Sequence, residues 1–295
     1  MLRVKNLRLK YPNGDRKIFD NLNLEIKNKE KVLLLGPSGS GKSTLLNVLS
    51  GIVPNLIELP MKYDELNIDH DSGVIFQDPD NQFCMPKVYE ELAFVLENRN
   101  IPRSEMDQEI EDALKSVDLN VTHKTYVNNL SGGMKQKLAI VETILQKSKT
   151  LFLDEPTASM DTSTRQRFWE IIRDLKAQGV TIFYSSHYIE EVEHTADRIL
   201  VLNKGELIRD TTPLAMRSEE IEKHFILPLA YKEVIEQSNL VENWSQKQDA
   251  LQVVTREADA FWQLLVQAGC RIQEIEVNNR SLLDTIFEET QKGDD

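Results

Sequence analysis

The sequence predicts an α/β fold with a mainly parallel central sheet. Three short apolar runs have the length of strands: KVLLLG at 31–36, TLFLDEP at 150–156 and VTIFYSSH at 180–187. Continuous apolar runs of this length are typical of strands that are buried on both faces. Segments with helical periodicity separate these runs, and strands that alternate with helices form parallel sheets covered by helices.

Further elements follow in order along the chain. LRVKNLRLKY at 2–11 and NLNLEIKN at 21–28 alternate apolar and polar residues, which predicts two edge strands of a small antiparallel sheet around the turn PNGD. Ser104 and Asp107 have the spacing of a capping box and predict the start of a helix within 101–117. The other predicted elements are a helix from Lys42 to about Ser50, an amphipathic helix at 162–179 ending at Gly179, a short helix at 189–196, and a hairpin at 198–208 that turns on Asn203 to Gly205.

The character of the sequence changes after about Asp210. The segment 211–245 is acidic and helix-prone, which predicts a helical linker, and 246–295 has the pattern of a small β-α-β-α unit. Ser281 and Asp284 are placed to cap the last helix of that unit. We therefore expect a first domain at 1–210, with a helical subdomain at about 85–145, the linker, and a small C-terminal α+β domain.

Composition narrows the class of protein. Hydrophobic residues make up 40% and charged residues 28% of the 295, which describes an ordinary globular chain without a membrane span or signal peptide. Cys84 and Cys270 give no disulfide framework, so a reducing, cytoplasmic location is expected. The net charge is −13, to which 16 acidic and 8 basic residues of 211–295 contribute −8. This acidic balance argues against nucleic acid and anionic lipid as partners.

The segment GPSGSGKST is a candidate phosphate-binding loop. It follows a buried strand, opens a helix and matches the spacing G-x-x-x-x-G-K-[ST]. Its glycines let successive backbone N–H groups converge on phosphate oxygens, and the helix N-terminus favours negative charge. Lys42 would reach the β- and γ-phosphates, and the Ser43 hydroxyl would bind Mg²⁺. The predicted ATP-binding residues here are Gly36, Pro37, Ser38, Gly39, Ser40, Gly41, Lys42, Ser43 and Thr44.

Two acidic residues end the second apolar run. Asp154 lies at the carboxyl end of a buried strand, where α/β folds bind their ligands, and would hold Mg²⁺ directly or through water. Glu155 is then placed to polarise the attacking water as a general base. The alternative is a solvated carboxylate at a strand end. Pro156 stops the strand and makes that alternative the weaker one.

A second glycine-rich helix start occurs at LSGGMKQKLAI, residues 130–140. Ser131, Gly132 and Gly133 would present a hydroxyl, bare N–H groups and a helix N-terminus to a phosphate. Taken alone, the segment is equally an ordinary N-cap. We interpret Lys135 and Lys137 as solvated helix residues.

Together these motifs resemble those of an ATP-binding cassette (ABC) ATPase of the P-loop NTPase class. Tyr11, GPSGSGKST, Gln77, LSGGMKQKLAI, LFLDEP, ASMD and His187 occur in the order of that family, over residues 1–210. The resemblance implies two cassettes that sandwich two ATP molecules, each nucleotide between the P-loop of one subunit and the LSGG of the other.

The resemblance also assigns the remaining site residues. It implies that Tyr11 stacks on adenine, although a core aromatic is the alternative, and that Gln77 contacts Mg²⁺ and water. It implies that Asp161 couples the two sites and that His187 contacts the γ-phosphate. Met134, the methionine of ASMD and a short interval from Ser50 to Gln77 depart from the family pattern without removing a catalytic group, so ATP hydrolysis is expected.

Such a cassette drives a partner, and the sequence favours a membrane permease. Coiled-coil ATPases of DNA repair insert a long segment that this chain lacks, and translation-associated relatives carry two cassettes, so a soluble non-transport ATPase ranks lowest. GIVPNLIE, VIFQDPDNQF and VYEELAFVLEN resemble the ATPases of energy-coupling-factor (ECF) importers of vitamins and transition-metal ions. The segment 251–290 instead resembles the appendix of ATPases that serve drug, antibiotic and peptide exporters. We expect an importer, with membrane contact only through the permease.

Overall fold

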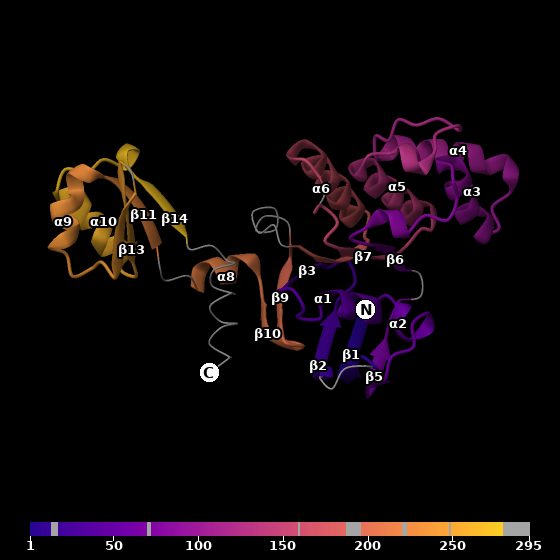
Figure 1. The fold of residues 1–295 in the computed structure, drawn as a ribbon, viewed down its shortest axis with the longest axis horizontal. Helices are drawn as coiled ribbons and strands as arrows, with labels where there is room; N and C mark the ends of the chain where they lie inside the picture. The colour runs from indigo at the N-terminus through magenta and orange to yellow at the C-terminus, as the bar shows by residue number, and fades with distance from the viewer. Residues whose placement is uncertain are drawn as a thin grey trace. The chain divides into compact units, whose positions relative to one another are not determined.

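The computed structural model describes residues 1–12, 17–69, 72–158, 160–186, 196–219, 223–247 and 249–279. The chain falls into two compact units, 1–211 and 212–295, which we treat separately (Figure 1). None of the described helices combines the length and the hydropathy needed to cross a membrane.

A six-stranded sheet is the centre of the first unit. Its strand order is β10-β9-β3-β8-β7-β6, and all neighbours are parallel except the hairpin of β9 and β10. The predicted apolar runs are β3, β8 and β7, three of the four inner strands, which confirms the predicted fold class. The bounds are β3 Lys31–Leu35, β6 Ser72–Ile75, β7 Thr150–Asp154, β8 Thr181–Ser185, β9 Arg198–Asn203 and β10 Glu206–Thr211.

The two faces of this sheet are covered by different elements. Successive side chains of a strand point to opposite faces. Phe183 of β8 packs in the cluster that includes Leu45 of α1 (Lys42–Leu49). The next residue, Tyr184, contacts the ring of Trp169 on α6 (Thr162–Ala177), with ring centroids 5.0 Å apart. Helices α1 and α6 therefore lie on opposite faces, and the sheet is buried between them.

A small antiparallel sheet packs against the α1 face. It consists of β1 (Leu2–Lys10), β2 (Lys17–Ile26), β4 (Met61–Lys62) and β5 (Glu65–Asn67). Its apolar side chains share one core with α1 and with the short helix α2 (Ile52–Asn55). The two predicted strands are thus confirmed, but only β2 of the two is an edge strand, because β1 pairs with β2 on one side and with β4 and β5 on the other.

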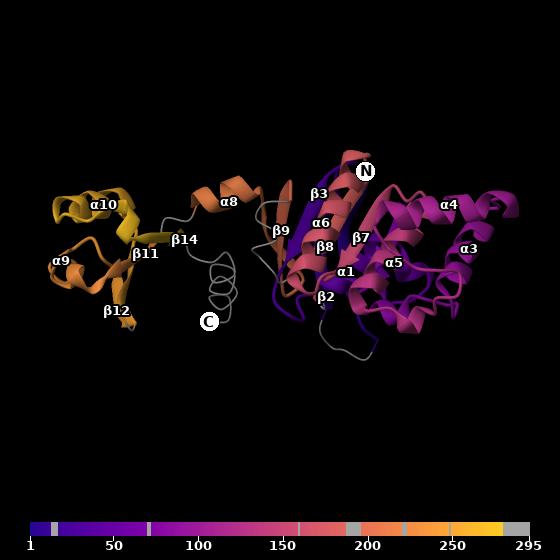
Figure 2. The ribbon, with the colours of Figure 1, turned by 90° about the horizontal axis from the view of Figure 1, so that it is seen from above.

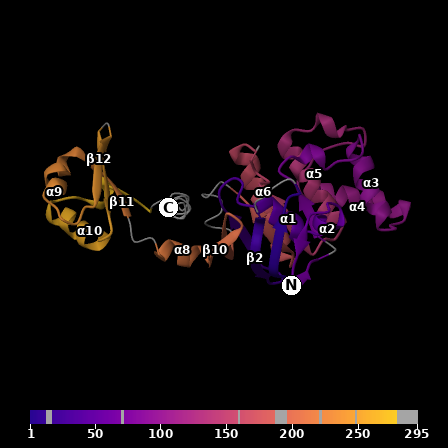
Figure 3. The same cartoon turned by 60° about the horizontal axis from the view of Figure 1, so that its bottom comes forward.

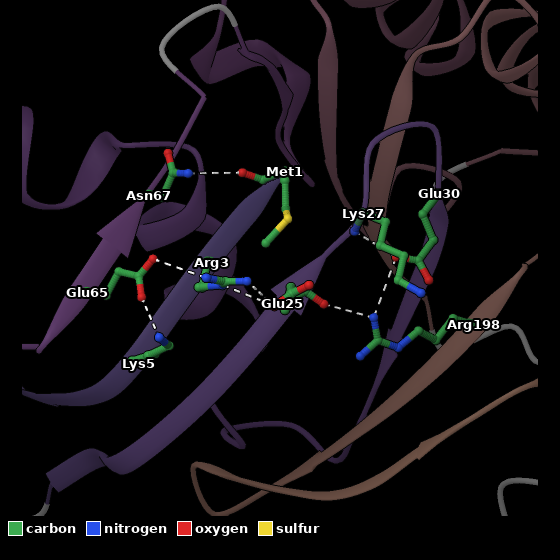
Figure 4. Close-up of polar contacts among 9 residues, drawn as sticks. All are labelled: Met1, Arg3, Lys5, Glu25, Lys27, Glu30, Glu65, Asn67 and Arg198. Atoms are coloured by element: carbon green, nitrogen blue, oxygen red, sulfur yellow. Dashed lines mark hydrogen bonds and ion pairs between the residues drawn. The ribbon is translucent and has the colours of Figure 1, made fainter.

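Polar contacts join the antiparallel sheet to the central sheet (Figure 4). Arg198, at the start of β9, donates to the backbone oxygen of Glu25 on β2 at 2.8 Å and lies 3.5 Å from the Glu30 carboxylate. Glu25 and Glu65 both pair with Arg3 of β1. Partly exposed ion pairs contribute little stability by themselves. Arg198 therefore contributes mainly by connecting β9 of the central sheet to β2 of the antiparallel sheet.

Three helices form the predicted helical subdomain, and they lie side by side in every view (Figures 1, 2 and 3). The capping box predicted at Ser104 and Asp107 is wrong, because the helix begins two residues earlier, with Pro102 at the N-cap position. The backbone N–H of Glu105 donates to the Pro102 carbonyl at 2.9 Å, so Ser104 is already inside the first turn. The bounds are α3 Val88–Asn98, α4 Arg103–Ser116 and α5 Gly132–Leu145, with short 3-10 turns at Pro79–Asn81 (η1) and Val127–Asn129 (η2).

The second unit is a four-stranded antiparallel sheet of order β12-β13-β11-β14 with two helices on one face. Phe225 of β11 and Phe261 of α10 meet edge to face with centroids 5.0 Å apart. The helical linker predicted at 211–245 is wrong in its secondary structure, because β11 and β12 lie within it and β11 pairs with both β13 and β14. The bounds are α8 Pro213–Glu219, β11 Lys223–Pro228, η3 Leu229–Tyr231, α9 Lys232–Glu236, β12 Asn243–Lys247, β13 Ala250–Thr255, α10 Ala258–Gln267, η4 Ile272–Glu274 and β14 Glu276–Asn279.

Several predicted features lie outside the described residues. They are the turn around 13–15, the helix at 189–196 with His187 before it, and the capped helix that begins at Ser281.

Candidate functional site

The phosphate-binding loop leads from β3 into α1, as the motif predicts. A side chain at Gly36 would place its Cβ 2.2 Å from the backbone oxygen of Leu202, so only glycine fits where the loop passes β9. Gly41 precedes α1 with φ of 106°, a left-handed conformation that favours glycine. No side chain caps this helix, and the N–H groups of its first turn have no intrahelical acceptor. The loop therefore ends in a helix N-terminus suited to an anion.

Lys42 lies in the concave side of this loop. Its Nζ donates to the carbonyl oxygens of Gly36 at 2.9 Å and Pro37 at 3.2 Å, and the side chain is buried. Burial lowers the pKa of Lys42, while the nearby charges of Glu155 and Asp154 raise it. The ammonium is thus held between the loop and the two carboxylates.

The carboxyl ends of β7 and β8 bring three further side chains together. Ser185, fully buried at the end of β8, donates from Oγ to Asp154 Oδ1 at 2.7 Å. The same Oγ accepts from the backbone N–H of Glu155 at 3.0 Å. Glu155 itself has φ of 48°, a left-handed conformation that non-glycine residues adopt only when their surroundings hold them there. The Ser185 hydroxyl therefore connects the Asp154 carboxylate to the backbone of Glu155.

Tyr11 lies at the rim of the same site. Its hydroxyl shares a hydrogen bond of 2.9 Å with Thr44 Oγ1, and the residue is 47% exposed. The core alternative for Tyr11 is therefore wrong. The bond to Thr44 holds the aromatic side chain beside the phosphate-binding loop.

Tyr11, the loop residues 38–44 and Glu155 line one open pocket of about 590 Å³, whereas Gly36, Pro37, Asp154 and Ser185 are not among its lining residues. The volume is in the range of small-molecule sites. Ser43 and Gln77 contribute a hydroxyl and an amide to its wall, and Asp154 lies next to Glu155. Such hard oxygen donors fit Mg²⁺. The lining consists of Tyr11, Lys17, Ile18, Ser38, Gly39, Ser40, Gly41, Lys42, Ser43, Thr44, Gln77, Glu155 and Lys204.

Four residues of this region were not predicted from the sequence as part of the site. Lys17 and Ile18 come from β2, and Lys204 is brought in by the β9–β10 turn, where Gly205 N donates to the Ser40 carbonyl at 3.1 Å. No local pattern marks them. Ser185 could have been predicted from the sequence. It is a polar residue at the carboxyl end of a buried strand, as Asp154 is at the end of β7.

The second glycine motif starts α5 and does not line this pocket. Ser131 is the N-cap, and its Oγ accepts from Met134 N at 3.3 Å. Ser131 and Gly132 are exposed. A Cβ on Gly133 would come 2.5 Å from Cγ2 of Thr164, so Gly133 is also a close-packing position against α6. Within one chain, the two glycine-rich helix starts form separate surfaces.

Asp161 is the N-cap of α6, next to that contact. Hydrogen bonds from Thr164 and Ser163 hold the pKa of Asp161 well below its usual range. Thr164 thus links Asp161 to the tight approach at Gly133, which connects the ASMD and LSGG segments inside one chain.

Of the two lysines that follow LSGG, Lys135 is not the solvated residue that the sequence predicted, whereas Lys137 is partly exposed. The side chain of Lys135 is only 12% exposed and pairs with Asp80. Lys137 Nζ donates to the carbonyl oxygen of Asp118 at 3.1 Å. Both anchor α5 to neighbouring segments, because those segments fold back over the helix, which the local pattern does not reveal.

Comparison with known proteins gives consistent results. Residues 19–158 match the ABC transporter family. The energy-coupling factor transporter ATP-binding protein EcfA of Methanothermobacter thermautotrophicus is 33% identical over 72% of this chain and 71% of its own length. The protein of the same name from Methanocaldococcus jannaschii is 32% identical over 74% of this chain and 81% of its own length.

Two solved structures extend this comparison to the fold. The structure of cbiO1 from Clostridium perfringens, part of the ABC transporter complex cbiONQ, has a TM-score of 0.63 and 29% identity, covering 81% of this chain and 94% of that one. A dimeric ATP-binding cassette in a post-hydrolysis state, with ADP and Pi bound, has a TM-score of 0.62 and 25% identity. The match covers 72% of this chain and 99% of that one.

Proposed function

Because the chain belongs to the ABC transporter family, we propose that it is the ATP-binding and ATP-hydrolysing subunit of a membrane transporter. One observation carries this proposal. The phosphate-binding loop, the rim aromatic Tyr11, the amide of Gln77 and the carboxylate of Glu155 all line a single pocket.

The groups of the first unit can divide the work of hydrolysis as follows. The loop N–H groups and Lys42 bind the β- and γ-phosphates, and Tyr11 stacks on the adenine. Ser43, Gln77 and Asp154 would hold Mg²⁺, which neutralises charge on the transferred phosphoryl group. Glu155 orients the attacking water and accepts its proton.

We propose further that the site is completed by a second cassette. Ser131, Gly132 and Gly133 lie outside the pocket of their own chain, and the helix start that they form is exposed. In a head-to-tail pair this helix N-terminus meets the γ-phosphate held by the partner. Asp161 would link the two sites, and His187, outside the described residues, would contact the γ-phosphate. ATP then closes the dimer, and hydrolysis with product release reopens it.

The direction we favour is import through an ECF-like transporter of a vitamin or a metal ion. The names of the EcfA relatives support the ECF-like part of this assignment. A transmembrane permease would be the partner, and the chain would be peripheral on the inner face of the cell membrane through that permease. Export of a drug, antibiotic or peptide is the alternative, and a soluble non-transport ATPase ranks below it.

Purification of the tagged chain from its native membrane tests this proposal. We expect it to co-purify with a compact coupling subunit of the importer type. Co-purification with a six-helix exporter permease would instead establish the alternative. ATP turnover per chain should rise with protein concentration, and concentration-independent turnover by a proven monomer would contradict the second-cassette proposal.

A further inference from the structure

Two buried carboxyl groups meet in the helical subdomain, outside the ATP pocket. Glu142 of α5 is 6% exposed and Glu91 of α3 is 4% exposed. Gln82, which follows η1, donates from Nε2 to Glu142 Oε2 at 2.9 Å. Glu91 Oε2 accepts from the backbone N–H of Cys84 at 2.9 Å and from that of Met85. The proposed reaction uses neither carboxyl group.

Glu142 is the member of this pair that holds a proton at neutral pH. The pKa of Glu142 is raised to about 8: burial is the largest cause, the bond from Gln82 opposes it, and the charge of Glu91 and a hydrogen bond with Glu91 add to it. Glu142 Oε1 is buried, and no N–H or hydroxyl donor of the described residues bonds to it. Glu91, by contrast, has two backbone donors. Protonation of Glu142 avoids the repulsion between two buried carboxylates.

The other charged groups around α5 are engaged elsewhere. Lys135 pairs with Asp80, and Lys137 donates to the Asp118 carbonyl. Arg99, after α3, donates to the Leu145 carbonyl at 2.6 Å. The buried residues with which α4 and β6 pack in this region are uncharged: Met106, Ile110, Ala113, Gly73 and Ile75. The charged groups that shift the pKa of Glu142 include no cation among the described residues.

The carboxyl pair lies in a junction that reaches both halves of the ATP site. The segment 76–85 carries Gln77, and α5 carries the LSGG segment at its N-terminus. Gln136 Nε2 of α5 donates to the Phe76 carbonyl at 3.3 Å, next to Gln77. Together with the bond from Gln82 to Glu142, this bond gives α5 two contacts with the 76–85 segment, one at Phe76 and one at Gln82.

We propose that Glu142 and Glu91 share one proton, and that this shared proton positions the LSGG helix against the segment that carries Gln77. Glu142 is thus a positioning residue, and its role in hydrolysis rests on the proposed function. When the proton is lost, two buried carboxylates repel each other and α5 separates from 82–85. The LSGG segment of one subunit is then displaced from the phosphate bound by the other.

Replacing Glu142 with Gln tests this proposal, because an amide keeps the shape of the protonated carboxyl and cannot ionise. Steady-state ATP hydrolysis is measured from pH 6 to 9.5 for the parent, for E142Q and for the control E97Q, whose side chain on α3 is 59% exposed. We expect the parent and E97Q to lose activity roughly tenfold between pH 8 and 9.5, as the protonated fraction falls. E142Q should keep its activity over the same range. Coincident profiles for the parent and E142Q would overturn the proposal.

Thermal unfolding of the same proteins gives a readout that does not depend on hydrolysis. Between the unfolded pKa near 4.5 and the folded pKa near 8, the native state holds a proton that the unfolded state has released, so this group lowers stability as pH rises. The Tm of the parent should therefore fall relative to that of E142Q across this window and run parallel above it. Parallel curves throughout would refute the shared proton. Absence of hydrolysis at every pH, with the Tm difference present, would instead refute the proposed function alone.

Discussion

Replacing Ser185 with Ala should uncouple the two acidic groups of the site from the sheet. Ser185 Oγ donates to Asp154 and accepts from Glu155 N, and the hydroxyl is fully buried. Losing one bond to a charged group and one to a backbone N–H removes about 2–4 kcal/mol of unfolding free energy. If roughly half of this energy also orients Glu155 in the transition state, kcat falls about fivefold to thirtyfold while the KM for ATP changes little.

The matched control is Thr181→Ala at the other end of β8. Thr181 is also buried, and its Oγ1 accepts from Lys29 N at 2.9 Å, far along the strand from the site. Urea unfolding should give a loss of stability for both variants, but only S185A should lose kcat. Equal kcat values for S185A and T181A would refute the assignment of Ser185 as the residue that positions Glu155.

Three further variants test other parts of the account. Glu155→Gln should retain ATP binding and lower kcat by about 10²–10⁴, because the general base is gone; an unchanged turnover rate would exclude this role. Gly133→Ala should cost about 1–3 kcal/mol in thermal or urea unfolding, since the new Cβ lies 2.5 Å from Cγ2 of Thr164, and T164S in the same chain should recover most of it. Tyr11→Ala should weaken ATP binding about tenfold in titration calorimetry, whereas Tyr11→Phe, which loses only the bond to Thr44, should bind nearly as the parent does; equal affinities for all three would contradict stacking.

The parts of the fold and site that the sequence predicted correctly are those whose signals are local. KVLLLG and TLFLDEP are strands because continuous apolar runs require burial on both faces, and the glycine loop follows from its own spacing. The strand ends then place Asp154 and the loop at one edge of the sheet, before any contact is known.

The parts that were missed depend on contacts between distant segments. Lys204 reaches the pocket only because the β9–β10 turn bonds to the loop at Ser40. Lys135 has the pattern of a solvated residue and is covered by the segment around Asp80. The region 211–245 has helix-forming composition, yet β11 there pairs on both sides, and this pairing overrides local propensity.

The central claim is that each ATP site is shared between two chains, and a mixing experiment tests it most directly. Lys42→Ala removes the loop cation from one chain, and Ser131→Arg blocks the LSGG helix start of another. Each variant alone should hydrolyse ATP poorly. When they are mixed, one of the two sites in the mixed dimer pairs an intact loop with an intact LSGG segment, so ATP hydrolysis should return. A mixture that stays inactive while the parent dimer is active, or S131R with the activity of the parent, would contradict the claim.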